Sequence, residues 1–146
     1  SDAGCPGVAD PGASLVAAAH REGITVVPLV GPSSILLALM ASGMNGQGFA
    51  FHGYLPVKAD ARTAAIHHLE ADSRRTGYAQ IFIETPYRNG ALLAALAASC
   101  KPATRLCVAA DLTLATESVV SQAISAWRGA DGTRYAKRPA IFVLQA

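Results

Sequence analysis

The chain has 146 residues, of which 51% are hydrophobic and 15% are charged, and its formal net charge is +2. This composition is typical of one ordinary folded domain and argues against a disordered chain. The weak net charge does not indicate a dedicated nucleic-acid-binding domain, which usually carries a dense basic patch, and no apolar run reaches the roughly 18 residues of a membrane span.

The chain begins with SDAGCPGVADPG, residues 1–12, in which three glycines and two prolines are typical of stacked turns. Such a loop can present backbone N–H groups to a polar ligand where it leads into a helix. An elaborate surface turn is an equal alternative for this stretch taken alone.

The next residues predict a strand–turn–helix unit. A helix with an apolar face is expected over residues 13–21. The β-branched run ITVVPL, residues 24–29, predicts a buried strand. It leads through GPSS into a helix over residues 35–41, which Ser33 or Ser34 can cap. Such a unit is a building block of an open α/β sheet.

The glycine-rich run GMNGQG, residues 43–48, is typical of a long loop, and we place a domain boundary there. Strands and helices alternate after it, which predicts an α/β fold with a mixed sheet. The expected elements are strands over residues 49–55, 79–84, 105–110, 118–123 and 139–145, helices over residues 60–74 and 87–99, and a short helix that ends at Trp127.

The cysteines and histidines bear on the compartment and on metal binding. Cys5, Cys100 and Cys107 form an odd number without C-x-x-C spacing, which favours free thiols in a reducing compartment. No stretch resembles a secretory signal, so we expect a cytoplasmic protein. We expect no metal site, because His67 and His68 are adjacent and therefore lie on different sides of a helix.

Four motifs occur in one order along the chain. They are SDAGCPGVADPG, VVPLVGPSS at residues 26–34, IFIETPYR at residues 81–88 and VAADLT at residues 108–113. In this order they resemble the tetrapyrrole methylase superfamily of S-adenosylmethionine (SAM) dependent methyltransferases. Within the superfamily they are most similar to the branch that 2′-O-methylates a cytidine of 16S ribosomal RNA.

The resemblance implies two α/β domains with SAM in the cleft between them. Members of the superfamily begin with a glycine-rich strand and loop, which this sequence does not contain. We therefore expect an N-terminally truncated fragment. Its residues 1–43 would be a Rossmann-like remnant of the SAM-binding domain, and residues 44–146 a C-terminal α/β domain with a mixed sheet. Family members are commonly dimeric, so a homodimer is expected.

The resemblance also implies the residues that bind SAM. Gly4, Cys5 and Pro6 would flank the methionine part of SAM, and Ser33 and Ser34 belong to a second SAM loop. Thr85, Pro86 and Ala140 would lie near the adenine. The superfamily usually has Thr where this chain has Cys5. Helix capping is the alternative role of the serines, and a plain strand start that of Ala140. The expected cofactor-binding residues are Gly4, Cys5, Pro6, Ser33, Ser34, Thr85, Pro86 and Ala140.

Asp10, Glu84, Arg88 and Asp111 are the residues expected near the substrate. Glu84 ends a buried strand and needs a partner, which Arg88 can supply. A structural ion pair and a substrate contact are equal alternatives for these two residues. The ribosomal RNA branch typically has an Arg-Glu pair followed by Leu-Thr-Lys where this chain has VAADLTL, so two plausible phosphate contacts are absent here. No residue is identified as a general base.

The expected function is methyl transfer from SAM to an RNA ribose hydroxyl, a displacement that is governed by positioning. The expected partner is RNA, either 16S ribosomal RNA or the small ribosomal subunit. No association with a membrane is expected. The alternatives are methylation of a tetrapyrrole or another small molecule, and a fragment that only binds or dimerises. The basic pair Lys137–Arg138 is interpreted as solvated surface charge, with a weak phosphate contact as the alternative.

Overall fold

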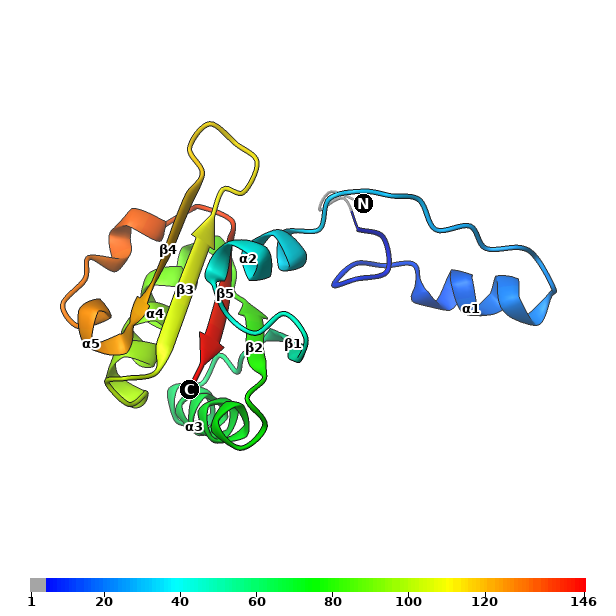
Figure 1. The fold of residues 1–146 in the computed structure, drawn as a ribbon. Coiled ribbons are helices and arrows are strands. Elements are labelled where there is room, and N and C mark those ends of the chain that lie inside the picture. The colour runs from blue at the N-terminus through cyan, green and yellow to red at the C-terminus, as the bar shows by residue number, and fades with distance from the viewer. Residues whose placement is uncertain (1–4) are drawn as a thin grey trace.

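The structure, a computed structural model, describes residues 5–146 (Figure 1). Gly4, an expected SAM-binding residue, lies outside the described residues. The elements follow in the order α1 (Ala13–Arg21), α2 (Ser34–Ser42), β1 (Phe49–Tyr54), α3 (Ala59–Thr76), β2 (Ala79–Ile83), η1 (Pro86–Arg88), α4 (Asn89–Ser99), β3 (Arg105–Ala110), β4 (Ser118–Ala123), α5 (Ile124–Trp127), η2 (Gly132–Tyr135) and β5 (Ala140–Gln145).

The strands form one five-stranded mixed sheet in the order β1-β2-β5-β3-β4, which confirms the expected fold class. β1 and β2 are parallel, whereas β5 is antiparallel to both of its neighbours, β2 and β3. β1, β2 and β3 therefore run in one direction, and their carboxyl ends meet the amino end of β5 at one end of the sheet. The pairs Ile83–Ile141 and Ala110–Ala140 fix that register.

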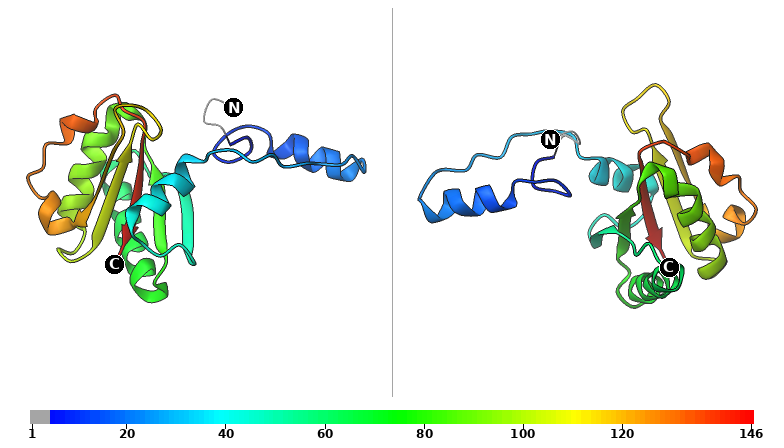
Figure 2. Two further views of the ribbon diagram at one scale, coloured as in Figure 1. Left: turned by 45° about the horizontal axis from the view of Figure 1, so that its top comes forward. Right: turned by 180° about the vertical axis from the view of Figure 1, so that it is seen from behind.

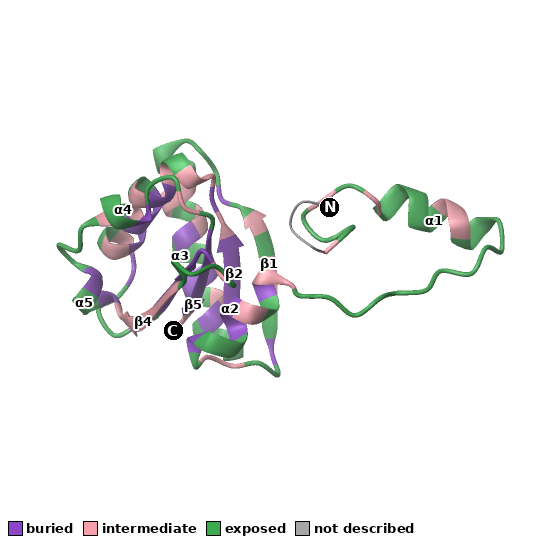
Figure 3. Ribbon diagram, turned by 90° about the horizontal axis from the view of Figure 1, so that it is seen from above, coloured by how far each residue is buried: buried purple, intermediate pink, exposed green. Residues whose placement is uncertain are grey.

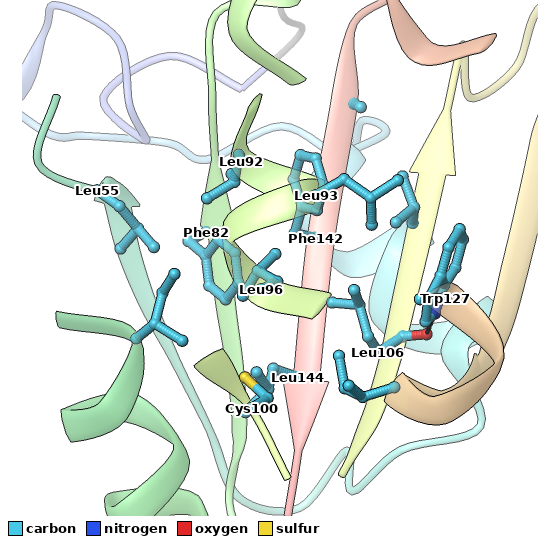
Figure 4. Packing of buried hydrophobic residues seen from close by; sticks show 14 of the residues in the cluster. Leu55, Phe82, Leu92, Leu93, Leu96, Cys100, Leu106, Trp127, Phe142 and Leu144 are labelled. Carbon is cyan, nitrogen blue, oxygen red and sulfur yellow. Dashed lines mark hydrogen bonds between the residues drawn. The ribbon is translucent and has the colours of Figure 1, made fainter. Parts of the chain in front are cut away.

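The two faces of the sheet are covered by different helices. In β2, Phe82 faces α4 while its neighbour Ile81 faces α2, because successive side chains of a strand point to opposite faces. The larger cluster, drawn in Figure 4, includes Phe82 and Phe142, whose rings stack with centroids 5.8 Å apart. Each fully buried apolar side chain contributes about 1.5–3 kcal/mol, so this face supplies most of the stabilising burial.

α2 covers the opposite face. Ile35, Ala38 and Leu39 are buried against β3 and β5, and the helix ends at Gly43, whose left-handed backbone (φ 68°) suits glycine. Ser33 occupies the N-cap position, but within the described residues its side chain makes no capping hydrogen bond. The domain boundary expected after residue 43 stays a prediction.

Most of the segment over residues 10–32 extends away from the sheet, as Figures 1 and 2 show. The helix expected over residues 13–21 is confirmed as α1, but in α1, which is described throughout, no residue is buried, and Leu15 is 74% exposed. The buried strand expected over residues 24–29 is wrong. Within the described chain no strand pairs with this segment, and it is exposed throughout (Figure 3). A β-branched run without a neighbouring strand has no ladder to join.

The remaining elements are confirmed to within a few residues. The helix expected over residues 87–99 begins as the short 3-10 turn η1, with Pro86 at its first position, where a missing N–H costs nothing. Among the described residues, no helix is both long and apolar enough to cross a membrane.

Candidate functional site

A pocket of about 420 Å³ opens at the end of the sheet where β2 and β3 finish and β5 begins. The carboxyl ends of parallel strands are a common place for ligand sites in α/β folds. The pocket brings together residues from the first loop, the start of α2 and the ends of four strands, β1, β2, β3 and β5. The expected site residues that line it are Cys5, Ser33, Ser34, Glu84, Pro86, Asp111 and Ala140.

Four other expected residues that the structure describes, Pro6, Asp10, Thr85 and Arg88, do not line the pocket. Pro6 is exposed next to a lining residue. The backbone N–H of Thr85 donates to a carboxylate oxygen of Glu84 at 2.6 Å.

Glu84 and Arg88 form an ion pair behind the pocket. Nε and Nη2 of Arg88 donate to Oε1 of Glu84 at 3.0 and 2.7 Å. Burial raises the pKa of Glu84, but the hydrogen bonds from Arg88 and Thr85 lower it by more, so the pKa lies below its usual value. The Glu84 side chain is 0% exposed although the residue is 4% exposed. The exposed part of Glu84 is therefore its backbone, and its carboxylate is enclosed beside Arg88.

Asp111 directly follows β3 and is one of the residues that line the pocket. Its Oδ2 accepts from Nε of Arg138 at 2.7 Å and from the hydroxyl of Thr116 at 2.9 Å. The Arg138 hydrogen bond is the main cause that lowers the pKa of Asp111; burial raises it and Thr116 lowers it further. Asp111 is therefore an anion at neutral pH.

Arg138 is a site residue that the sequence analysis missed. It was interpreted as solvated surface charge, yet its side chain is 23% exposed and joins Asp111 to Thr116, whose carbonyl accepts from Nη2 at 2.6 Å. A third bond runs from Nη1 to the carbonyl of Arg134. The only signal in the sequence is its place just before the last strand.

Aromatic and aliphatic side chains make up much of the remaining lining, and the sequence analysis missed these too. Phe51 and Tyr54 come from β1 and Ile83 from β2. Tyr54 is 60% exposed at the rim. Their common signal is position near the carboxyl end of a strand, which becomes informative only once the strand order is known.

The three cysteines are free thiols, as expected. Cys5 is partly exposed at the pocket, whereas Cys100 and Cys107 are buried. Burial raises the pKa of Cys100 to about 12 and that of Cys107 to about 11. Within residues 5–146, no group of three or more His, Cys, Asp and Glu side chains is arranged to hold a metal ion.

Similar proteins were found by sequence and by structure, although no protein-family model matches the chain. Over 121 residues the chain is 39% identical to ribosomal RNA small subunit methyltransferase I of Neisseria meningitidis serogroup B, a match that covers 83% of this chain and 40% of the relative. The protein of the same name from Vibrio cholerae is 42% identical over 88 residues, 60% of this chain and 29% of the relative. The chain thus spans less than half the length of these relatives.

The fold is similar to that of solved methyltransferases. The methyltransferase CobJ superposes with a TM-score of 0.62 at 18% identity, covering 97% of this chain and 61% of that one. The cobalt precorrin-4 methyltransferase CbiF has a TM-score of 0.54 at 14% identity, covering 90% and 56%. At these identities the likeness establishes the fold.

Proposed function

We propose that the chain belongs to the tetrapyrrole methylase superfamily and is part of a SAM-dependent methyltransferase that acts on ribosomal RNA. Its similarity to ribosomal RNA small subunit methyltransferase I over 83% of its length supports the RNA substrate. The proposed reaction is 2′-O-methylation of a cytidine ribose in 16S ribosomal RNA.

The observation that carries the proposal is the convergence of the expected SAM-binding residues on one pocket. Cys5 comes from the first loop, and Ser33 and Ser34 come from the start of α2. Pro86 begins η1, just after β2, and Ala140 begins β5. These segments are far apart in sequence. A mostly apolar pocket with a few convergent polar groups is the usual form of a small-molecule site.

The residues present fit an adenosyl cofactor. The start of α2 has unpaired backbone N–H groups, which favour electron-rich ligand atoms such as a carboxylate. The small side chains of Pro86 and Ala140 leave room beside the strand ends for a flat ring. When bound, SAM supplies a methyl group already activated on sulfur. The residues of this chain then hold the two reactants in line, which is the main requirement of such a transfer.

On the substrate side, we propose Asp111 rather than Glu84. The carboxylate of Glu84 is enclosed with Arg88, whereas Asp111 faces the pocket. A role for Asp10 in substrate binding stays a prediction.

Calorimetry with SAM or S-adenosylhomocysteine on the full-length protein tests the cofactor. Heat of binding is expected, and no heat at millimolar ligand would contradict the methyltransferase function. Transfer of a labelled methyl group to 30S subunits or naked ribosomal RNA, compared with transfer to uroporphyrinogen, tests the substrate. Activity on uroporphyrinogen alone would replace the RNA substrate with a tetrapyrrole.

We also propose a homodimer in the cytoplasm, where ribosomal RNA is found. Apolar side chains on the segment before α2 support association: Leu29 is 89% exposed and Val27 is 68% exposed, and exposed apolar surface of this kind is usually covered by a partner. Light scattering at tens of micromolar protein tests the dimer, which a strictly monomeric mass would contradict. Cell fractionation tests the location.

A further inference from the structure

The two carboxylate oxygens of Asp111 are in different environments. Oδ2 accepts from both Arg138 and Thr116. Oδ1 accepts no hydrogen bond from any described residue, yet it is not enclosed like the isolated oxygen of Glu84. The side chain is 10% exposed and lines the pocket. Asp111 is thus a nearly buried, pocket-lining residue with one carboxylate oxygen that has no partner among the described residues.

This carboxylate is held in place from several sides. Asp111 has a left-handed backbone with φ 53°, which costs a non-glycine residue energy and is often found at functional sites. Its N–H donates to the carbonyl of Pro139 at 2.9 Å, which continues the pairing of β3 with β5 by one step. Together with the Arg138 and Thr116 bonds, these contacts fix Oδ1 before any ligand arrives.

The chemistry of the site restricts what Oδ1 can bind. An ionised carboxylate only accepts hydrogen bonds, so the ligand must offer an O–H or N–H group. Arg138 already offsets the negative charge, which favours a neutral donor over a cation, and a phosphate would be repelled. The surrounding wall includes the apolar side chains of Phe51, Ile83 and Leu112. A sugar hydroxyl on a nucleoside meets these requirements.

We propose that Asp111 Oδ1 accepts a hydrogen bond from a ribose hydroxyl of the nucleoside bound in this pocket. The inference rests on the proposed function, and the ribose belongs either to the adenosyl cofactor or to the target nucleotide. Asp111 is then the residue that orients a sugar at the meeting point of β3 and β5.

The test compares wild-type full-length protein with Asp111→Asn. The amide keeps the shape and can still accept from Arg138, but it then presents an N–H₂ donor to the ribose hydroxyl. If the ribose belongs to the cofactor, the Kd of S-adenosylhomocysteine rises about tenfold or more, the equivalent of one lost hydrogen bond to a charged group. If it belongs to the RNA, that Kd is unchanged and kcat/KM on 30S subunits falls by a similar factor.

Asp131→Asn is the matched control. Asp131 is also hydrogen-bonded, to Thr133, but it is exposed and does not line the pocket, so both constants should stay at wild-type values. A second measurement needs no variant: wild-type protein should bind a cofactor product or an RNA lacking the relevant ribose hydroxyl about tenfold more weakly.

The outcomes separate the two proposals. The role of Asp111 would be overturned if Asp111→Asn kept wild-type values of both the S-adenosylhomocysteine Kd and kcat/KM, and if wild-type protein bound the ligands that lack the ribose hydroxyl as tightly as the ligands that have it. The methyltransferase function would then stay intact. Wild-type protein that neither binds S-adenosylhomocysteine nor transfers a methyl group would overturn the proposed function itself.

Discussion

Arg138 Nε lies 2.7 Å from Asp111 Oδ2 and joins the residue after β3 to the segment just before β5. The two strands already pair through Ala110 and Ala140 at this end. The side-chain bond therefore closes the end of the ladder where the pocket begins. It ties the position of a pocket anion to the register of the sheet.

Replacing Arg138 with lysine should weaken this arrangement while keeping the charge. Lysine lacks the planar guanidinium group, so it cannot donate to the Asp111 carboxylate and the Thr116 carbonyl in the same fixed geometry. We expect kcat/KM for methyl transfer to fall about tenfold, with the far-UV circular dichroism unchanged. Arg128→Lys, at an exposed residue after α5, is the control. Equal kcat/KM values for the two variants would show that the Arg138 guanidinium has no role in positioning Asp111.

Glu84→Gln should lower the free energy of unfolding at pH 7 by about 2 kcal/mol, because hydrogen bonds to a buried charge are replaced by neutral ones. The pKa of Glu84 is below its ordinary value of 4.5, so this stability is present above pH 4.5 and is lost as the pH falls through the folded-state pKa. The difference in the free energy of unfolding between wild type and Glu84→Gln should therefore become smaller at acid pH. Urea denaturation over a pH series measures it.

Asp72→Asn serves as the comparison for Glu84. Asp72 pairs with Arg75 on the surface of α3, and exposed pairs contribute little. We expect no measurable loss of the free energy of unfolding for Asp72→Asn at pH 7. A loss as large as that of Glu84→Gln would mean that burial does not account for the Glu84 effect.

Alkylation at pH 8 should label Cys5 in the folded protein and leave Cys100 and Cys107 unmodified. Burial raises the pKa of Cys100 to about 12 and that of Cys107 to about 11, and the thiolate is the reactive form. Because Cys5 lines the pocket, S-adenosylhomocysteine should slow its labelling. Peptide mass spectrometry reads out each site, and labelling in urea should reach all three. Rapid labelling of Cys107 without urea would contradict the burial.

The sequence predicted the strands well where each of them pairs with another strand of the sheet. Ile81 and Phe82 form a strand that is buried on both faces, and such a run needs only local information to be recognised. Val27 and Leu29 belong to an equally apolar run that is exposed. A strand requires a partner as well as a propensity, and propensity alone cannot supply one.

The residues of the candidate site also fall into two groups: those that a motif predicted and those that depend on the strand order. Ser33, Ser34 and Asp111 were expected from motifs, and all three line the pocket. Arg138 and Tyr54 belong to no recognised motif. They reach the site because the strand order places β1 beside β2 and β5 beside β3, and that order depends on long-range pairing that a local pattern does not encode.

Tyr54 offers a test of RNA binding at the rim of the pocket. It is the last residue of β1, it lines the pocket, and it is 60% exposed. An exposed aromatic ring beside a nucleoside site can stack on an unpaired base, which contributes about 1–3 kcal/mol. Tyr54→Ala should therefore raise KM for 30S subunits about tenfold or more, while the Kd of S-adenosylhomocysteine stays constant.

Tyr54→Phe should restore the wild-type KM, because stacking uses the ring and not the hydroxyl. Tyr78→Ala is the control at the other end of the sheet: Tyr78 precedes β2 and is 47% exposed. β1 and β2 are parallel with Phe49 opposite Ala79, so Tyr78 lies at the end away from the pocket and its loss should leave KM unchanged. If Tyr54→Phe is as impaired as Tyr54→Ala, the hydroxyl rather than stacking is responsible. If neither differs from wild type, the RNA does not cross this side of the pocket.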